Sequence, residues 1–317
     1  MNFPLQAAEI SGTVHLKHLG VIRATGPEAN KFLQGQLTQD LTKLNSAQAC
    51  LAAFCNAKGR MQASFVVFQS SADDILLICS RDLIAATVKR LSMFVMRAKV
   101  TLCDASDEFA LYGVAGNAVQ SLAGRSGAPW TKADLAGAAL VFLYPGAGQQ
   151  RAIWCAPTGS AVPGGSELQL ETWNWLEVQS GVALVSQPIF EAFVPQMLNY
   201  ESVDGVNFKK GCYPGQEIVA RSKFRGTIKR RAYLVHSDAS LDIGQPVVHS
   251  QDTDQPCGMV AASAANPAGG FDAIVSLQTA AATDALANPG AFRLSAGHAH
   301  GPALALLTLP YLLREDI

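Results

Sequence analysis

The chain has 317 residues, of which 49% are hydrophobic and 15% charged, and its net charge is −1. This length is sufficient for two or three domains, and the composition is typical of a well-buried globular protein. The near-zero net charge excludes a global attraction for nucleic acid or for a membrane, so any anion site must be local.

The N-terminus and the cysteines indicate a cytoplasmic protein without a membrane span. Residues 1–5 lack a basic segment followed by an apolar run, and no apolar stretch approaches the ~20 residues that span a bilayer. The seven cysteines are odd in number, and no two are spaced as C-x-x-C. This pattern favours reduced, buried thiols over disulfides or a zinc site, so we expect no metal centre.

The first third of the chain mixes helix and strand patterns. Gly26-Pro27-Glu28 predicts the start of a helix, with proline at the first helical position, and Phe32, Leu33 and Leu37 as its buried face. Strand-like runs cover residues 63–68, 75–79 and 99–103. Between the last two, apolar residues recur with the period of an amphipathic helix, at Ile84, Val88, Leu91 and Val95.

A similar order recurs more loosely in the next part of the chain. Strand-like runs cover residues 109–114, 139–144 and 152–155, and helices are expected at 117–122 and at about 167–180. Helices mixed with short strands in two comparable halves, about 1–105 and 106–228, predict an α+β fold.

The pattern changes at about Lys229, where helical periodicity disappears. Short β-type runs, punctuated by Gly, Pro, Asn and Asp, recur at 232–236, 246–249, 257–261, 271–277 and 303–309. Such spacing predicts a small β-barrel or sandwich. We therefore expect an α+β domain at 1–228 and a β-domain at 229–317.

Positive charge is concentrated in one segment. Residues 209–231 hold eight Lys or Arg against a single acid, Glu217. The local potential favours a carboxylate, a phosphate or a polyanion. An RNA-binding module built on this cluster is therefore one alternative, although no RNP, KH or zinc-knuckle pattern accompanies it.

Cys212 lies within this segment and differs in context from the other cysteines. It is flanked by Gly211 and lies close to lysines, and neighbouring positive charge favours the reactive thiolate. Gly211 and Gly215 permit a tight loop, and Pro214-Gly215 predicts a turn that leads into a short helix at Gln216-Glu217. We expect an accessible, functional thiol; a buried cysteine in a turn is the alternative.

The same residues carry a resemblance to a known family. Lys210-Gly211-Cys212-Tyr213-Pro214-Gly215-Gln216-Glu217, followed by Ala220-Arg221, resembles the signature K-G-C-[YF]-x-G-Q-E-x-x-A-R of the YgfZ family of folate-binding proteins. Further counterparts follow the family's order along nearly the whole chain, at residues 32–36, 56–60, 94–100 and 193–200.

This resemblance implies a fold, a function and partners. The fold is a GcvT-like folate-binding domain of two related α+β halves, with a C-terminal antiparallel β-barrel that closes a three-part ring. The function is tetrahydrofolate-dependent support of iron–sulfur enzyme assembly or repair and of tRNA modification such as thiolation. The partners are folate, iron–sulfur enzymes or their assembly factors, and tRNA in weak contact. We expect a monomer.

The resemblance also implies a set of site residues, with Cys212 as the functional thiol. Trp173 falls where the family has an aromatic residue that can stack on the pterin, although a plain core role is the alternative. Gln179 falls where folate-binding relatives carry an acid. The remaining candidates for folate contact lie in the motif itself: Lys210, Gly211, Tyr213, Gly215, Gln216, Glu217 and Arg221.

Aminomethyltransferases of the glycine cleavage system share the implied fold but differ at a catalytic position. Their G-G-x-x-D-D run falls on residues 59–64 of this chain, where Ala63 and Ser64 replace both acids. Transfer of an aminomethyl group needs a carboxylate at this place. Folate-dependent aminomethyl transfer is thus an alternative that these two residues weigh against.

Overall fold

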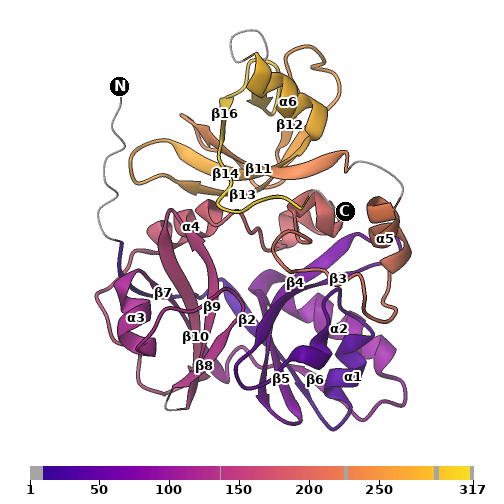
Figure 1. Ribbon diagram of the computed structural model, residues 1–317, viewed down its shortest axis with the longest axis vertical. Helices are drawn as coiled ribbons and strands as arrows, with labels where there is room; N and C mark the ends of the chain where they lie inside the picture. The colour runs from indigo at the N-terminus through magenta and orange to yellow at the C-terminus, as the bar shows by residue number, and fades with distance from the viewer. Residues whose placement is uncertain (1–9, 136, 225–227, 289–292, 315–317) are drawn as a thin grey trace.

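Two five-stranded sheets and a closed barrel form the three bodies of the molecule, which occupy the corners of a triangle (Figure 1). The computed structural model describes residues 10–135, 137–224, 228–288 and 293–314. The predicted α+β class and the C-terminal antiparallel barrel are confirmed. Within the described residues, no helix combines the length and the apolar character needed to cross a bilayer.

The first sheet has the strand order β3-β4-β5-β2-β6, and all neighbouring strands are antiparallel. Helix α2 packs on β2 and β6, and α1 contacts β5. Phe32, Leu33 and Leu37 are buried, as predicted. The elements are β2 (Leu19–Thr25), α1 (Ala29–Gln34), β3 (Ala49–Cys55), β4 (Met61–Ser71), β5 (Asp74–Ser80), α2 (Ile84–Val95) and β6 (Thr101–Asp104).

The second sheet has the order β1-β7-β10-β9-β8 and is also antiparallel. Strand β1 precedes the first sheet in the sequence but belongs to the second sheet, where Gly12 pairs with Ala115 of β7. The elements are β1 (Gly12–His15), β7 (Phe109–Ala115), α3 (Asn117–Ala123), β8 (Lys132–Leu135), β9 (Ala138–Gly146), β10 (Gln149–Pro157) and α4 (Leu170–Gln179).

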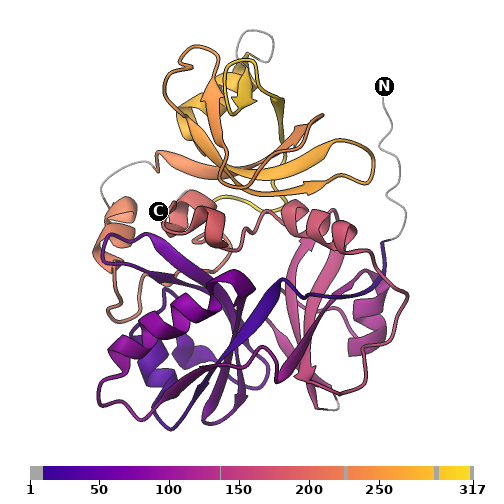
Figure 2. The same ribbon diagram turned by 180° about the vertical axis from the view of Figure 1, so that it is seen from behind.

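After α4 the chain returns to the first sheet. The 3-10 turns η3 (Gln187–Ile189) and η4 (Pro195–Leu198) lead to α5 (Gln216–Phe224), which lies beside the end of the first sheet in both views (Figure 2). Backbone bonds fix this return, since Met61 N–H donates to the Phe193 carbonyl at 2.8 Å and Glu191 N–H donates to the Met61 carbonyl at 2.9 Å.

The barrel has the closed order β11-β14-β13-β12-β15-β16. Its elements are β11 (Arg230–Ser237), β12 (Pro246–His249), β13 (Gly258–Ala265), β14 (Phe271–Gln278), α6 (Thr279–Ala287), β15 (Leu294–Ala296) and β16 (Ala303–Leu307). Helix α6 was not among the elements predicted after Lys229. Its sequence is rich in alanine and buries only Ala281 and Ala282, so helix propensity rather than apolar periodicity marks it.

A buried carboxylate joins the barrel to α4. Asp272 on β14 is 1% exposed, and its Oδ2 accepts hydrogen bonds from Trp175 Nε1 at 2.6 Å and from Gln179 Nε2 at 2.8 Å, both on α4. Asn266 Nδ2 also donates to this oxygen, and His236 Nδ1 lies 2.7 Å from Oδ1. These bonds satisfy a group that would otherwise be costly to bury.

Candidate functional site

The cysteine-motif loop, residues 207–215, packs against the turn between β3 and β4. Gly215 has φ +78°, and a Cβ at this position would lie 2.4 Å from the Asn56 carbonyl oxygen and 2.6 Å from Gly59 Cα. The turn itself is closed by Asn56 Oδ1, which accepts from the backbone N–H of Lys58 and Arg60 at 2.9 and 3.0 Å. Two segments about 150 residues apart thus meet backbone to backbone.

Lys210 fastens this loop to the C-terminal end of α1 and the turn that follows it. Its Nζ donates to the carbonyl oxygens of Gln34 and Leu37, and its ammonium lies 5.1 Å from the centroid of the Tyr213 ring. Burial lowers the pKa of Lys210 to about 8, while the negative charge of Asp40 opposes this shift. The side chain therefore positions the loop and does not extend into solvent.

The loop presents the sulfur of Cys212 to solvent. Cys212 is exposed, whereas Cys103 is half-buried and the other five cysteines are buried. Burial raises the pKa of Cys50, Cys55 and Cys155 to about 12, so these groups remain protonated thiols at neutral pH. The structure thus excludes the alternative in which the Cys212 sulfur is packed inside the turn.

The rest of the motif forms α5 and its first turn. Gln216 Nε2 is 3.5 Å from the Lys210 carbonyl oxygen. Glu217 and Arg221 are both exposed and form an i,i+4 ion pair at 2.8 Å. On the inner side of the helix, the buried Gln196 donates its Nε2 to the Val219 carbonyl at 2.5 Å. The hydrogen bond from Gln196 in η4 to a backbone carbonyl therefore holds the motif helix α5 in place.

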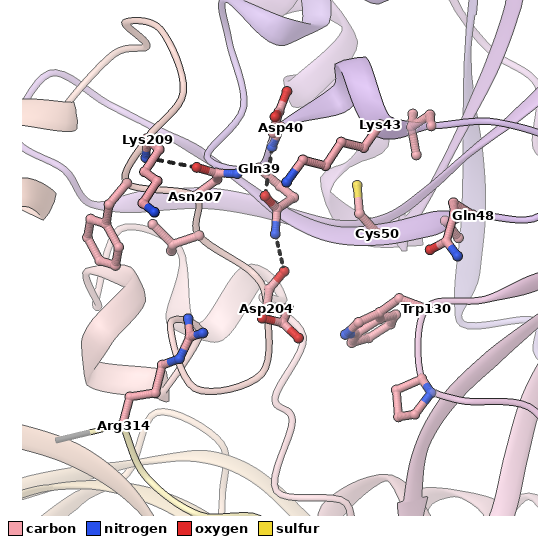
Figure 3. Close-up of a pocket in the computed structure, with 15 residues that line it drawn as sticks. Gln39, Asp40, Lys43, Gln48, Cys50, Trp130, Asp204, Asn207, Lys209 and Arg314 are labelled. Atoms are coloured by element: carbon pink, nitrogen blue, oxygen red, sulfur yellow. Dashed lines mark hydrogen bonds between the residues drawn. The ribbon is translucent and has the colours of Figure 1, made fainter. Parts of the chain in front are cut away.

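A pocket of about 510 Å³ opens beside this loop (Figure 3). Side chains from four separate regions of the chain approach it, and they include the cations Lys43, Lys209 and Arg314 and the aromatic residues Trp130 and Phe208. Its lining residues are Gln39, Asp40, Lys43, Leu44, Gln48, Ala49, Cys50, Pro129, Trp130, Asp204, Val206, Asn207, Phe208, Lys209 and Arg314.

Hydrogen bonds hold several pocket residues in place. Trp130 has φ +64° and donates its indole Nε1 to the Val203 carbonyl at 2.9 Å, which fixes the ring. Arg314 Nη1 donates to the Glu201 carbonyl at 3.2 Å. Hydrogen bonding by Thr42 is the main cause of a lowered pKa at Asp40, so this carboxylate stays ionised. The pocket therefore has fixed aromatic and charged groups on its walls.

Comparison with known proteins identifies the family. The chain is 32% identical over 249 residues to the tRNA-modifying protein YgfZ of Photorhabdus laumondii, which covers 75% of each chain. It is 35% identical over 230 residues to the protein of the same name from Klebsiella pneumoniae, which covers 68% of each chain. The chain belongs to the YgfZ family.

Two further comparisons concern the fold of this YgfZ-family protein. Residues 6–143 match the family model of the GCVT N-terminal domain. The aminomethyltransferase T of the glycine cleavage system from Bartonella henselae superposes with a TM-score of 0.61 at 15% identity, over 95% of this chain and 86% of that one. The GcvT-like fold that the motifs imply is therefore confirmed.

Two predicted contact residues of this YgfZ-family protein lie away from the pocket. Trp173 is fully buried, Arg151 stacks on its ring at 4.6 Å, and a Cβ on Gly113 would lie 2.6 Å from the same ring. Trp173 is thus a core residue. Gln179 points to the barrel and is hydrogen-bonded to Asp272.

The motif residues lie near the pocket but not among its lining residues. Lys210, Gly211, Tyr213, Gly215, Gln216, Glu217 and Arg221 shape the adjacent loop and helix, and their neighbour Lys209 faces the pocket. Sequence reasoning did not identify Lys43, Trp130 and Arg314 because they lie in three distant segments. Among the described residues, no three His, Cys, Asp or Glu side chains gather as a metal site would require.

The basic segment does not form one free surface. Arg231 is paired at 2.6 Å with Glu201, which is fully buried, and Arg230 Nη1 donates to the Cys257 carbonyl at 2.9 Å. Burial raises the pKa of Glu201, and the charge of Arg231 opposes this shift. Arg225 of this segment lies outside the described residues.

The two positions at which transferases carry acids lie inside β4. Ala63 and Ser64 are both fully buried. Ser64 Oγ accepts a hydrogen bond from the Val185 backbone N–H at 2.8 Å, so this hydroxyl has a structural partner. Neither residue offers a carboxylate for proton transfer.

Proposed function

We propose that this protein binds a reduced folate, with tetrahydrofolate preferred, and thereby supports tRNA modification through the assembly or repair of iron–sulfur enzymes in the cytoplasm. Its relatives are named tRNA-modifying proteins, and its N-terminal part matches the GCVT domain. The pocket volume of about 510 Å³ lies within the range of small-molecule sites.

The chemistry of the pocket fits the two ends of a folate. Trp130 and Phe208 provide aromatic surface for the flat pterin and aminobenzoate rings, and such stacking contributes roughly 0.5–1.5 kcal/mol beyond burial. Lys43, Lys209 and Arg314 provide cations for the glutamate carboxylates. The observation that carries the proposal is this convergence of aromatic and cationic side chains beside the cysteine-motif loop.

Calorimetry with tetrahydrofolate tests the placement of the glutamate tail. A direct contact between a cation and a carboxylate contributes roughly 1.5–3 kcal/mol, so Lys43→Ala or Lys209→Ala is expected to weaken binding by about 10–100-fold. Arg221→Ala is the matched control, because Arg221 is exposed on α5 and paired with Glu217. A larger loss for Arg221→Ala than for the pocket variants would instead place the tail on α5. No binding at millimolar tetrahydrofolate would refute the proposal.

The second part of the proposal assigns Cys212 as the functional thiol. It is exposed on a loop held in place on both sides of the cysteine, by Lys210 and by Gly215. In this role the Cys212 sulfur would contact the iron–sulfur enzyme that is being assembled or repaired. In cells that lack the protein, a Cys212→Ala copy is expected not to restore tRNA thiolation, whereas a Cys103→Ala copy restores it. Full restoration by Cys212→Ala would show that the motif acts through its backbone and charges alone.

Aminomethyl transfer is not part of the proposed function. A carboxylate is absent at positions 63 and 64, and both side chains are sealed in the core. We expect no turnover in a reconstituted glycine-cleavage assay with the lipoyl carrier protein. Turnover at the rate of a true transferase would contradict this part of the proposal.

A further inference from the structure

Exposed apolar side chains lie at the C-terminal end of α2 and at Phe190, directly after η3. Met93 is 63% exposed and Met96 is 89% exposed, and Phe94 and Phe190 are each more than one third exposed. Folding alone gains nothing from such exposure, because apolar surface in water is unfavourable. Clustered apolar side chains on a surface mark interaction sites.

Beneath the patch lies a separate pocket of about 270 Å³, formed by Phe54, Ala86, Met93 and Phe190 with Gln62 and Arg90. Gln62 donates its Nε2 to Glu191 at 2.7 Å, but among the described residues its buried Oε1 has no hydrogen-bond partner. This oxygen is shielded from solvent, so it does not present an acceptor to a molecule that enters the pocket. The pocket thus has room for one apolar side chain.

The backbone at the end of α2 is strained. Met96 has φ +43° and ψ −99°, which is an uncommon conformation for a residue with a Cβ. The Met96 side chain is exposed to solvent. Strain of this kind persists mainly where function uses it.

The charge around the patch is mainly positive, and among the described residues the one acid bonded to a pocket residue, Glu191, accepts a hydrogen bond from Gln62. Residues 83–103 contain Lys89, Arg90, Arg97 and Lys99 and no acidic residue. All four are exposed, and the Arg90 guanidinium lies 5.1 Å from the Phe94 ring. An acidic partner is therefore electrostatically complementary to this rim.

We propose that this patch docks an acidic segment of a partner protein, which inserts one apolar side chain into the pocket between Met93 and Phe190. The lining of this pocket is mainly apolar, and the flexible side chain of Met93 can change its conformation to fit an inserted side chain. Single-stranded RNA would instead use a cationic groove with stacked aromatic rings. The proposal is independent of folate binding.

Peptide selection tests the proposal on the full chain. Random 16-residue peptides displayed on phage are selected on the wild-type protein, with counter-selection on the Met93→Ser/Phe190→Ser double variant. The enriched peptides are expected to carry an apolar residue flanked by Asp or Glu. Enrichment of basic peptides, or no enrichment above the counter-selected background, would overturn the proposal.

Synthetic copies of the selected peptides are then measured by fluorescence anisotropy. The double variant and Arg97→Glu are each expected to weaken binding at least tenfold, and Arg97→Glu tests charge without touching the pocket. Leu286→Ser on α6 and Lys58→Glu are matched controls, because both side chains are exposed elsewhere. Equal binding by all variants would contradict the assigned surface.

Two other occupants are examined with the same variants. If a 20-nucleotide single-stranded RNA binds the wild type and loses affinity in the double variant, the patch is an RNA site and the proposal fails. If sedimentation shows a dimer that the double variant abolishes, the partner is a second copy and the acidic segment is excluded.

Discussion

Replacing Gly215 by alanine tests whether the motif glycine is required by backbone packing. Gly215 has φ +78°, and its Cβ would lie 2.4 Å from the Asn56 carbonyl oxygen and 2.6 Å from Gly59 Cα. The neighbouring atoms belong to backbone, so no flexible side chain can move aside. At Gly211, four residues earlier in the same motif, a Cβ would have no neighbouring atom within 4 Å.

The expected magnitudes follow from these two environments. A left-handed conformation costs an L-residue roughly 1–2 kcal/mol, and forced overpacking adds about 1–3 kcal/mol. Reduced entropy of the unfolded chain returns about 0.4–1 kcal/mol. Gly215→Ala should therefore lower the free energy of unfolding by about 2–4 kcal/mol. Gly211→Ala should change it by no more than about 0.5 kcal/mol.

Thermal unfolding followed by circular dichroism measures the difference. At about 2–4 °C per kcal/mol for a domain of this size, Gly215→Ala should lower Tm by roughly 5–12 °C and Gly211→Ala should leave it unchanged. Limited proteolysis should also cut near residue 212 faster in Gly215→Ala. Equal Tm values for Gly215→Ala and wild type would refute the packing argument. If Gly211→Ala is stable but inactive in cells, Gly211 has a role in function rather than in folding.

Two further predictions concern the thiols and the contact between barrel and α4. Limited alkylation from pH 5 to 9, followed by mass spectrometry, should label Cys212 first, because Cys212 is exposed and burial raises the pKa of Cys50, Cys55 and Cys155 to about 12. Earlier labelling of a buried thiol would contradict the exposed position of Cys212 on its loop. Asp272→Asn should lower the unfolding free energy by about 2–5 kcal/mol and alter Trp175 fluorescence, since an amide replaces a carboxylate that accepts from three donors. The exposed Asp238→Asn is its control, and equal stability of the two variants would refute this account.

The sequence predicted elements well where periodicity was strong. The apolar period from Ile84 to Val95 marks α2, and the run 246–249 coincides with β12. Strand β3 was not predicted, because its seven buried residues, Ala49–Cys55, lack alternation and include small side chains. Strand β1 has only four residues and pairs with β7, about 100 residues away, so no local pattern reveals it.

The candidate site was less predictable than the fold because its residues come from distant segments. The cysteine motif drew attention to positions 210–221, yet most of these side chains hold the loop and helix in place. Trp130 follows a Gly-Ala-Pro turn with no periodic signal, and Arg314 approaches from the end of the chain. Only the packing of the bodies brings them to one pocket.

The basic segment shows why a charge count along the chain differs from a charge count on the surface. Arg231 compensates the buried carboxylate of Glu201, Lys210 is bound to two carbonyl oxygens, and Arg230 is bound to a third. A cation held in this way is not available to release counterions from a phosphate backbone. RNA binding through this segment would then depend on exposed cations such as Lys209, Arg221 and Lys229, of which Arg221 is paired with Glu217. Among the described residues of this segment, fewer cations are therefore free for RNA than the count along the chain suggests, and Lys209 lines the pocket proposed for folate.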